Sequence, residues 1–268
     1  MSVQLPGARV LLTGASGGIG QAIARALHAR GAALMLTGRR ADALEPLAAE
    51  VSGTAIAADL GSADGVRRLL DEAKQVDILV ANAALPGSGY LLDYSDEEID
   101  QVLAVNLRTP VIMTRHLVPQ MRERGGGHIV FIGSLSSKAA AEQSALYSAT
   151  KFGLRGFSLA LRQDLHGTGV GVSIVLPGFV RDAGMYADAG APSQPGVRTV
   201  SPQAVARGVL RAITQDRAEI AVAPPELRAG ATIAAIAPQL AATLQRRTGG
   251  SAMAAVIAEG HQAKGKRT

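Results

Sequence analysis

The chain of 268 residues has no cysteine and no tryptophan, and only 3% of its residues are aromatic. Without cysteine it cannot form a disulfide, bind a metal through thiolates or use a thiol as a nucleophile. Hydrophobic residues still make up 47% of the chain. A large core is therefore expected, and Ala, Val, Leu and Ile must fill it.

Other absences narrow the class of protein. The five histidines are scattered without metal-ligand spacing, so we predict no metal site. No apolar run of about 20 residues is free of charge and proline, so we predict no membrane-spanning helix. The segment Met1–Gly7 lacks the basic flank and apolar run of a signal peptide. These features, together with the absence of cysteine, predict a cytoplasmic protein.

Positive charge is in excess, with a formal net charge of +5. A basic surface can attract nucleic acid or anionic lipid. The charges are spread along the chain, however, and the one dense cluster lies in the tail, at Lys264, Lys266 and Arg267. Because no nucleic-acid-reading motif is present, we predict no nucleic-acid partner.

Apolar runs typical of β-strands alternate with helical patterns. Most runs are continuously apolar, as in strands buried on both faces. They lie at Arg9–Leu12, Ala33–Thr37, Thr54–Ala58, Asp77–Ala81, His128–Gly133, Gly171–Leu176 and Glu219–Val222. The helical patterns lie at Gly18–Arg30, Ala41–Val51, Ser62–Gln75, Ser95–Arg122, Leu146–Leu165 and Pro202–Gln215. This order predicts an α/β fold: a single-domain, Rossmann-type, doubly wound parallel sheet in three layers.

Two segments depart from this alternation. Phe179–Ser201 is rich in glycine and proline and follows the carboxyl end of a strand, so we interpret it as a substrate lid, with a plain connection as the alternative. Leu227–Arg247 has a helical pattern that Pro238 should bend. Its apolar face comprises Ile233, Ile236, Leu240 and Leu244. That face would pack on its own domain, cover a neighbouring subunit or touch a membrane surface.

A glycine-rich turn, Thr13–Gly20 (TGASGGIG), joins the first expected strand to the first expected helix. Glycines allow a tight turn and close backbone approach to a pyrophosphate, and the helix start offers free N–H groups and a positive dipole end. The flanking strand and helix supply the context that such a motif requires. The sequence therefore predicts a dinucleotide site, with a flexible glycine loop as the alternative.

The G-x-x-x-G-x-G spacing of this turn, with Thr13 before it, resembles the short-chain dehydrogenase/reductase family. The resemblance covers most of the chain. It implies a dinucleotide-binding and catalytic domain over residues 1–225 and a helical extension with a basic tail over residues 226–268. The cofactor contacts it implies in the turn are Gly14, Ser16, Gly18, Ile19 and Gly20.

The end of the second strand bears on the choice of cofactor. An acid at this position would hold the ribose hydroxyls and favour NAD, but the chain has Thr37-Gly38-Arg39-Arg40. Guanidinium groups bind phosphate through forked hydrogen bonds. We therefore predict NADP(H) rather than NAD(H), with Arg39 as the main contact to the 2′-phosphate. A solvated basic pair at a helix start is the alternative.

Three more strand ends match cofactor-binding segments of the family. Asp59, with Leu60 beside it, is expected near the adenine, although Asp59 could instead cap a helix. Asn82 is expected to brace the sheet, and the Ala83 backbone to pass the ribose. Pro177, Gly178 and Val180 match the segment beside the nicotinamide. The family's usual Thr two residues after that Val is replaced by Asp182. Asp182 would accept a hydrogen bond from the nicotinamide carboxamide, unless the lid lies differently.

The catalytic candidates are Tyr147 and Lys151, four residues apart on one helical face, and Ser134 at the end of a strand. A Lys ammonium beside a phenol favours the phenolate. The resemblance makes Tyr147 the general acid or base and has Lys151 lower its pKa and hold the nicotinamide ribose. It implies that Ser134 donates a hydrogen bond to the substrate oxygen and that Asn106 holds a water that relays protons to Lys151.

Alternatives to these assignments remain. Ser134 is chosen over Ser136 and Ser137 by spacing alone. Asn106 would otherwise be a buried polar residue of a helix, and Tyr147 and Lys151 an exposed helical pair.

The substrate region is expected in Leu85–Leu92, Leu135–Ser144 and the lid. Its expected residues are mainly small or apolar: Leu85, Leu91, Leu135, Ala139–Ala141, Phe179, Met185 and Tyr186. We therefore predict an NADP(H)-dependent oxidoreductase that interconverts a carbonyl and a secondary alcohol on a hydrophobic substrate. An NADP(H)-binding redox sensor and a nucleotide-free epoxide- or halide-processing enzyme are the alternatives. The resemblance also implies a homodimer or homotetramer.

Overall fold

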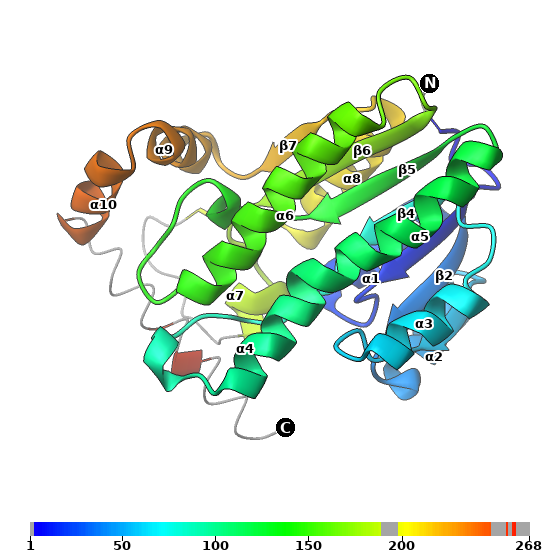
Figure 1. Cartoon of the computed structure of the whole chain (residues 1–268), viewed down its shortest axis with the longest axis horizontal. Helices are drawn as coiled ribbons and strands as arrows, with labels where there is room; N and C mark the ends of the chain where they lie inside the picture. The colour runs from blue at the N-terminus through cyan, green and yellow to red at the C-terminus, as the bar shows by residue number, and fades with distance from the viewer. Residues whose placement is uncertain (1–2, 189–197, 248–255, 257–258, 261–268) are drawn as a thin grey trace.

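Seven parallel strands form one sheet in the order β3-β2-β1-β4-β5-β6-β7 (Figure 1). The computed structural model describes residues 3–188, 198–247, 256 and 259–260. The strands are β1 (Arg9–Thr13), β2 (Ala33–Gly38), β3 (Thr54–Ala57), β4 (Ile78–Ala81), β5 (Gly127–Ile132), β6 (Val170–Pro177) and β7 (Glu219–Val222). The strand order reverses beside β1, between β1 and β4. The expected α/β fold class and doubly wound parallel sheet are confirmed.

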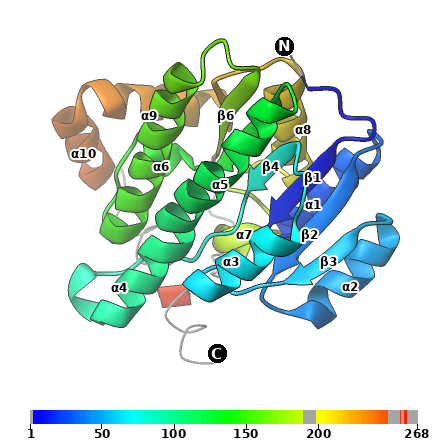
Figure 2. The same ribbon diagram turned by 45° about the vertical axis from the view of Figure 1, so that its right-hand side comes forward.

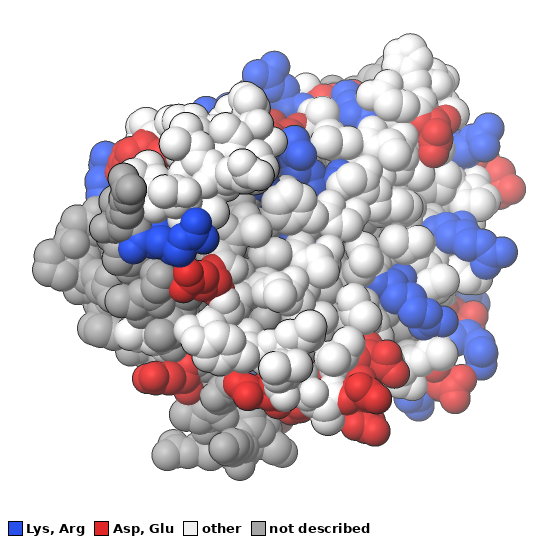
Figure 3. Space-filling model, turned by 60° about the vertical axis from the view of Figure 1, so that its left-hand side comes forward, with Lys and Arg blue, Asp and Glu red and all other residues white. Residues whose placement is uncertain are grey.

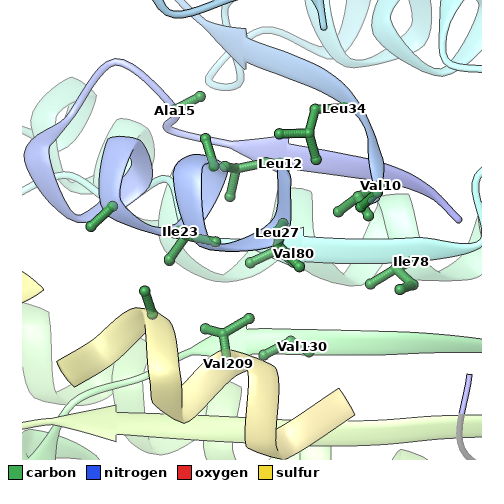
Figure 4. Packing of buried hydrophobic residues seen from close by; sticks show 14 of the residues in the cluster. Val10, Leu12, Ala15, Ile23, Leu27, Leu34, Ile78, Val80, Val130 and Val209 are labelled. Atoms are coloured by element: carbon green, nitrogen blue, oxygen red, sulfur yellow. The ribbon is translucent and has the colours of Figure 1, made fainter. Parts of the chain in front are cut away.

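Helices cover both faces of this sheet (Figures 1 and 2). One face carries α1 (Gly18–His28), α2 (Ala41–Glu50) and α8 (Pro202–Thr214). The other carries α3 (Ala63–Glu72), α5 (Thr109–Glu123) and α6 (Ala145–Asp164). Because side chains alternate along a strand, Val10 and Leu12 of β1 enter the first core while Leu11 enters the second. Figure 4 shows the first core, where Val209 of α8 lies near Ile23 of α1.

The expected helix over Ser95–Arg122 is one continuous rod with an internal irregularity. It comprises α4 (Asp96–Leu103), the π-helical turn η2 (Ala104–Arg108) and α5. Pro110 has no N–H to donate to the carbonyl of Asn106, four residues earlier, so the regular ladder cannot continue there. A wider turn absorbs this break, and Asn106 lies inside it.

The expected bent helix over Leu227–Arg247 was wrong in detail, because the structure has two helices. They are α9 (Pro225–Ile236) and α10 (Pro238–Arg247), and they meet at Ala237, whose backbone is not helical. Pro238 cannot donate a backbone hydrogen bond and its ring clashes with the preceding turn, but it is well suited to the first position of a new helix.

The segment expected to be a lid is described in part. Val180 and Val200 form an isolated parallel bridge, and α7 (Gly184–Asp188) lies between them in sequence. Residues 189–197 lie outside the described residues. No helix in the described residues combines the length and apolar character that a membrane crossing needs.

Candidate active site

The turn between β1 and α1 depends on glycine at three positions. Gly14 has φ +64°, and a Cβ there would lie 2.8 Å from the Cα of Ala83. A Cβ on Gly18 would lie 2.6 Å from that of Ala183, and one on Gly20 would collide with the carbonyl oxygen of Gly14. Each glycine therefore allows two pieces of backbone to approach closely at the carboxyl edge of the sheet.

The start of α1 is open to an anion. Its first turn has no acidic residue, and within the described residues its N-cap, Gly17, supplies no side-chain hydrogen bond. Free N–H groups and the positive end of the helix dipole therefore face the turn. The glycine cradle and this helix start fit the pyrophosphate of a dinucleotide.

Asn82 braces the sheet beside the turn, as expected. Its side-chain amide donates to the carbonyl oxygens of Thr13 and Gly14, each at 3.0 Å. In return the Thr13 hydroxyl accepts from the backbone N–H groups of Asn82 and Ala83, also at 3.0 Å. These bonds fix the end of β4 against the end of β1, so the glycine turn has a rigid support.

The predicted cofactor residues at the β2 and β3 ends line a single large cavity. Arg39 and Asp59 both face it, together with Leu60. Asp59 accepts a hydrogen bond from the backbone N–H of Gly61 at 2.9 Å. The cap of α3 is Ser62, whose hydroxyl accepts from Gly65, so the alternative of Asp59 as the helix cap was wrong.

Ser134 and Tyr147 meet at the end of β5. Ser134 Oγ accepts from the backbone N–H of Ser136 at 3.1 Å, which fixes the hydroxyl and leaves its proton available. It also hydrogen-bonds to the Tyr147 phenol. Burial raises the pKa of Tyr147 to about 12, and the bond from Ser134 opposes that rise. The net shift is opposite to the lowering expected from Lys151, so Tyr147 is a phenol at neutral pH.

Lys151 is buried next to this pair. Its Nζ donates to the carbonyl oxygen of Ile132 at 3.0 Å and lies 5.6 Å from the centre of the Tyr147 ring. Burial lowers the pKa of Lys151 to about 8, because the cation is desolvated. The ammonium therefore titrates close to physiological pH.

Asn106 has a bracing role in the structure. Its Oδ1 accepts from the backbone N–H of Leu85 at 2.7 Å, and its Nδ2 donates to the carbonyl oxygen of Leu85 at 2.9 Å. Nδ2 also approaches the Thr150 hydroxyl at 3.4 Å. Asn106 thus ties the chain after β4 to helix α6. The relay of protons through a water to Lys151 stays a prediction.

The Pro177–Val180 segment continues from β6 as expected, and Gly178 donates to Val222 at 3.0 Å. Pro177, Gly178 and Val180 all line the cavity. Asp182 does not belong to that lining. Its carboxylate is 80% exposed and lies 3.7 Å from Arg181, so it does not face the cavity in which it was expected to accept from the carboxamide.

The cavity has a volume of about 1000 Å³ and extends beyond Ser134, Tyr147 and Lys151. Of the expected substrate residues, Leu85, Ala140, Ala141, Phe179, Met185 and Tyr186 line it. Leu91, Leu135 and Ala139 do not line it: Leu91 is 51% exposed and Leu135 packs against the second core, so placing these three in the pocket was wrong.

Sequence reasoning missed one wall of the cavity. The C-terminal helices contribute Leu227, Ala242, Gln245 and Arg246 to the lining. The apolar face expected on these helices points elsewhere, since Ile233, Ile236, Leu240 and Leu244 are 53–80% exposed. Packing of that face on its own domain was therefore wrong. Figure 3 shows this side of the molecule, where uncharged surface dominates and acidic residues gather along the lower edge.

Comparisons with known proteins agree with this geometry. A family model described as short chain dehydrogenase matches residues 8–193. The ketoacyl reductase HetN of Nostoc sp. is 38% identical over 229 residues, which cover 81% of this chain and 79% of that protein.

Solved structures are similar as well. A short-chain dehydrogenase from Sphingobium yanoikuyae in complex with NADPH matches with a TM-score of 0.75 and 26% identity, over 87% of this chain and 95% of that one. A short chain dehydrogenase from Burkholderia cenocepacia in complex with NADP matches with a TM-score of 0.72 and 30% identity, over 82% and 97%.

Proposed function

The chain belongs to the short-chain dehydrogenase/reductase family, and we propose that it is an NADP(H)-dependent oxidoreductase interconverting a carbonyl and a secondary alcohol on a hydrophobic substrate. The observation that carries the proposal is the meeting of Ser134, Tyr147 and Lys151 at one end of a cavity whose other end is the glycine turn. Residues 1–225 would supply the binding and catalytic domain, and residues 226–268 the extension.

The proposed chemistry assigns one role to each side chain. When bound, the nicotinamide supplies or accepts the hydride. Tyr147 donates its phenolic proton to the carbonyl oxygen in the direction of reduction, for which a raised pKa keeps it protonated. Ser134 donates a hydrogen bond to the same oxygen, where negative charge develops. Lys151 places a positive charge beside the Tyr147 ring.

The cofactor proposal depends on charge at the end of β2. Arg39 faces the cavity, and the β2 end offers no acid to hold a free ribose hydroxyl pair. The guanidinium group would hold a 2′-phosphate. Complexes of two structural relatives with NADPH and NADP support this choice.

The substrate proposal depends on the apolar side chains in the cavity lining. Phe179, Met185 and Tyr186 line it from one side and Leu85 and Leu227 from others. Such a lining favours an apolar ketone or alcohol. Because HetN is named a ketoacyl reductase, a β-ketoacyl thioester belongs among the compounds to test.

We propose a homodimer or homotetramer in the cytoplasm. The exposed face of α9 and α10 is where a neighbouring subunit or a membrane surface would make contact.

The test is to follow NADPH consumption by absorbance against apolar ketones, diketones and a β-ketoacyl thioester, with NADH in parallel. Turnover that prefers NADPH and disappears in Tyr147→Phe is the expected result. Tight NADPH binding without turnover on any compound would support the redox sensor instead. A protein that binds neither nucleotide would contradict the whole proposal.

A further inference from the structure

A cluster of three charged side chains joins the two elements that carry the catalytic residues. Glu219 presents one carboxylate oxygen to Lys138 Nζ and the other to Arg155 Nε, the latter at 2.6 Å. The three side chains are only 17–29% exposed. Although burial raises the pKa of Glu219, the hydrogen bonds from Lys138 and Arg155 outweigh it and hold that pKa below its usual value. Glu219 is therefore an anion shared by two cations.

The two cations come from the two elements that carry the catalytic groups. Lys138 directly follows the short 3-10 turn η3 (Leu135–Ser137), whose N-cap is Ser134. Arg155 lies on α6 one turn after Lys151 and two turns after Tyr147. Glu219 itself begins β7, on a third element.

The register of the sheet gives the level of Glu219 relative to the strand that ends near the catalytic residues. Glu219 pairs with Ile174 of β6, and Ile174 pairs with Phe131 of β5. The next residue of β5, Ile132, accepts the hydrogen bond from Lys151. Glu219 therefore lies two strands from β5 and one residue below the level of Ile132.

We propose that Glu219 is a positioning residue that holds the Ser134 turn against the Tyr147–Lys151 helix and balances the positive charge beside them. This inference assumes the proposed function, in which Ser134 and Tyr147 share one substrate oxygen. Their separation is set by how the turn after Ser134 lies against α6, and Glu219, which is distant in sequence, joins the two elements by a pair of charge-assisted bonds.

Charge and length can be separated at this position. Glu219→Gln keeps the length of the side chain but leaves Lys138 and Arg155 without their anion. Added positive charge stabilises a phenolate, so Tyr147 should ionise at a lower pH, by about half a unit or more. Glu219→Asp keeps the charge but is too short to bridge both cations, so it tests the geometric part alone.

The chain offers a matched control on the same helix. Asp216 forms a two-oxygen ion pair with Arg162 of α6, at 2.7 and 2.9 Å. This pair is partly buried like the Glu219 cluster and also holds α6, but it does so about three turns beyond Lys151 and makes no bond to the Ser134 turn. Asp216→Asn removes the same kind of bond, and asparagine tolerates the positive φ of 46° at this position.

The experiment has a kinetic and a spectroscopic arm. In the kinetic arm, Glu219→Gln and Glu219→Asp should lower kcat about tenfold or more, because small displacements of reacting groups are that costly. NADPH affinity should stay within about twofold. The alkaline limb of the kcat/KM profile follows Lys151, and the loss of an anion also lowers the pKa of that ammonium, so the limb should move to lower pH in Glu219→Gln only. Asp216→Asn should reduce thermal stability while leaving kcat and the limb unchanged.

The spectroscopic arm needs no substrate. Ultraviolet difference titration of each protein against its Tyr147→Phe counterpart isolates this phenol from the other three tyrosines. Earlier ionisation in Glu219→Gln, but not in Glu219→Asp or Asp216→Asn, supports the proposal. A folded Glu219→Gln protein in which Tyr147 titrates as in the native protein overturns the proposal, as do equal effects in Asp216→Asn.

Absence of NADPH turnover in the native protein would count against the proposed function alone, and the titration would still decide the role of Glu219. If Glu219→Gln does not fold, Lys138→Gln and Arg155→Gln carry the test from the cationic side, and native kcat in both overturns the proposal.

Discussion

Strand β5 has a buried ionisable side chain near each end, and their surroundings differ. At its start, His128 is 1% exposed, and its Nε2 lies 2.8 Å from the Ser173 hydroxyl. Its Nδ1 has no hydrogen-bond partner among the described residues. At its end, Lys151 is 2% exposed and is held by the carbonyl oxygen of Ile132.

Burial shifts the pKa of both groups in the same direction. It lowers the pKa of His128 to about 4 and that of Lys151 to about 8. The histidine is then neutral over the physiological range, whereas the lysine titrates within it. Only Lys151 lines the cavity. The comparison teaches that a perturbed pKa indicates a functional site only where the group also meets a space for a ligand.

The substitution Tyr147→Phe should have the largest effect among the tests of this contrast. Loss of the phenolic proton should lower kcat by about 1000-fold, within the range that general acids contribute. NADPH binding should remain, because the ring and its packing are kept. Tyr94→Phe is the control, since Tyr94 is half-buried and its phenol donates to the Ser88 carbonyl oxygen at 3.0 Å. Equal losses in both variants would show a general effect on folding.

The second test is at Lys151. We predict that Lys151→Met lowers kcat/KM by about 100-fold, because the positive charge beside Tyr147 is lost. In the native enzyme, activity should decline as pH rises through about 8, where Lys151 loses its proton. The pH profile of the Lys151→Met protein should lack this limb. A native profile flat to pH 9.5 would contradict the assignment.

The third test addresses the other end of β5. Because the pKa of His128 is about 4 when folded and about 6.5 when unfolded, its burial favours the folded state above pH 6.5. That contribution is lost as pH falls from 6.5 to 4 and amounts to about 3 kcal/mol. Urea denaturation at pH 7.5 and 4.5 should show a smaller pH-dependent loss in His128→Gln than in the native protein. His166→Gln, at an exposed position, should behave as the native protein does, and kcat should not change in either.

The smallest expected effect is at Arg39. Arg39→Ala should reduce the preference for NADPH over NADH by about tenfold to 100-fold, the usual contribution of a hydrogen bond to a charged group. The preference is measured as the ratio of kcat/KM values for the two nucleotides. Arg68→Ala, an exposed substitution on α3, should leave that ratio unchanged. If the Arg39→Ala protein kept the native ratio, Arg39 would not be the residue that binds the 2′-phosphate.

Patterns within single segments predicted most of the fold. The continuous apolar runs predicted all seven strands, and the glycine turn, the bracing by Asn82 and the Ser134–Tyr147 contact follow from local motifs. The π-helical turn at Asn106 was not predicted, although Pro110 in a helical pattern is a signal for it.

Contacts between distant segments could not be predicted in this way. The lining by Arg246 of α10 and the bridge from Glu219 to Lys138 and Arg155 depend on how elements pack in three dimensions. The apolar pattern of Leu227–Arg247 was also misleading, because periodicity shows that a helix has an apolar face but does not show what that face meets.

The tie between Asn106 and Leu85 has a consequence for altering this protein. Asn106 holds both backbone polar groups of Leu85, while the Leu85 side chain lines the cavity. The backbone at position 85 is thus secured independently of which side chain it carries. A library of substitutions at this one codon would vary the shape of the pocket while the surrounding framework stays in place, which makes position 85 a practical starting point for redirecting substrate choice.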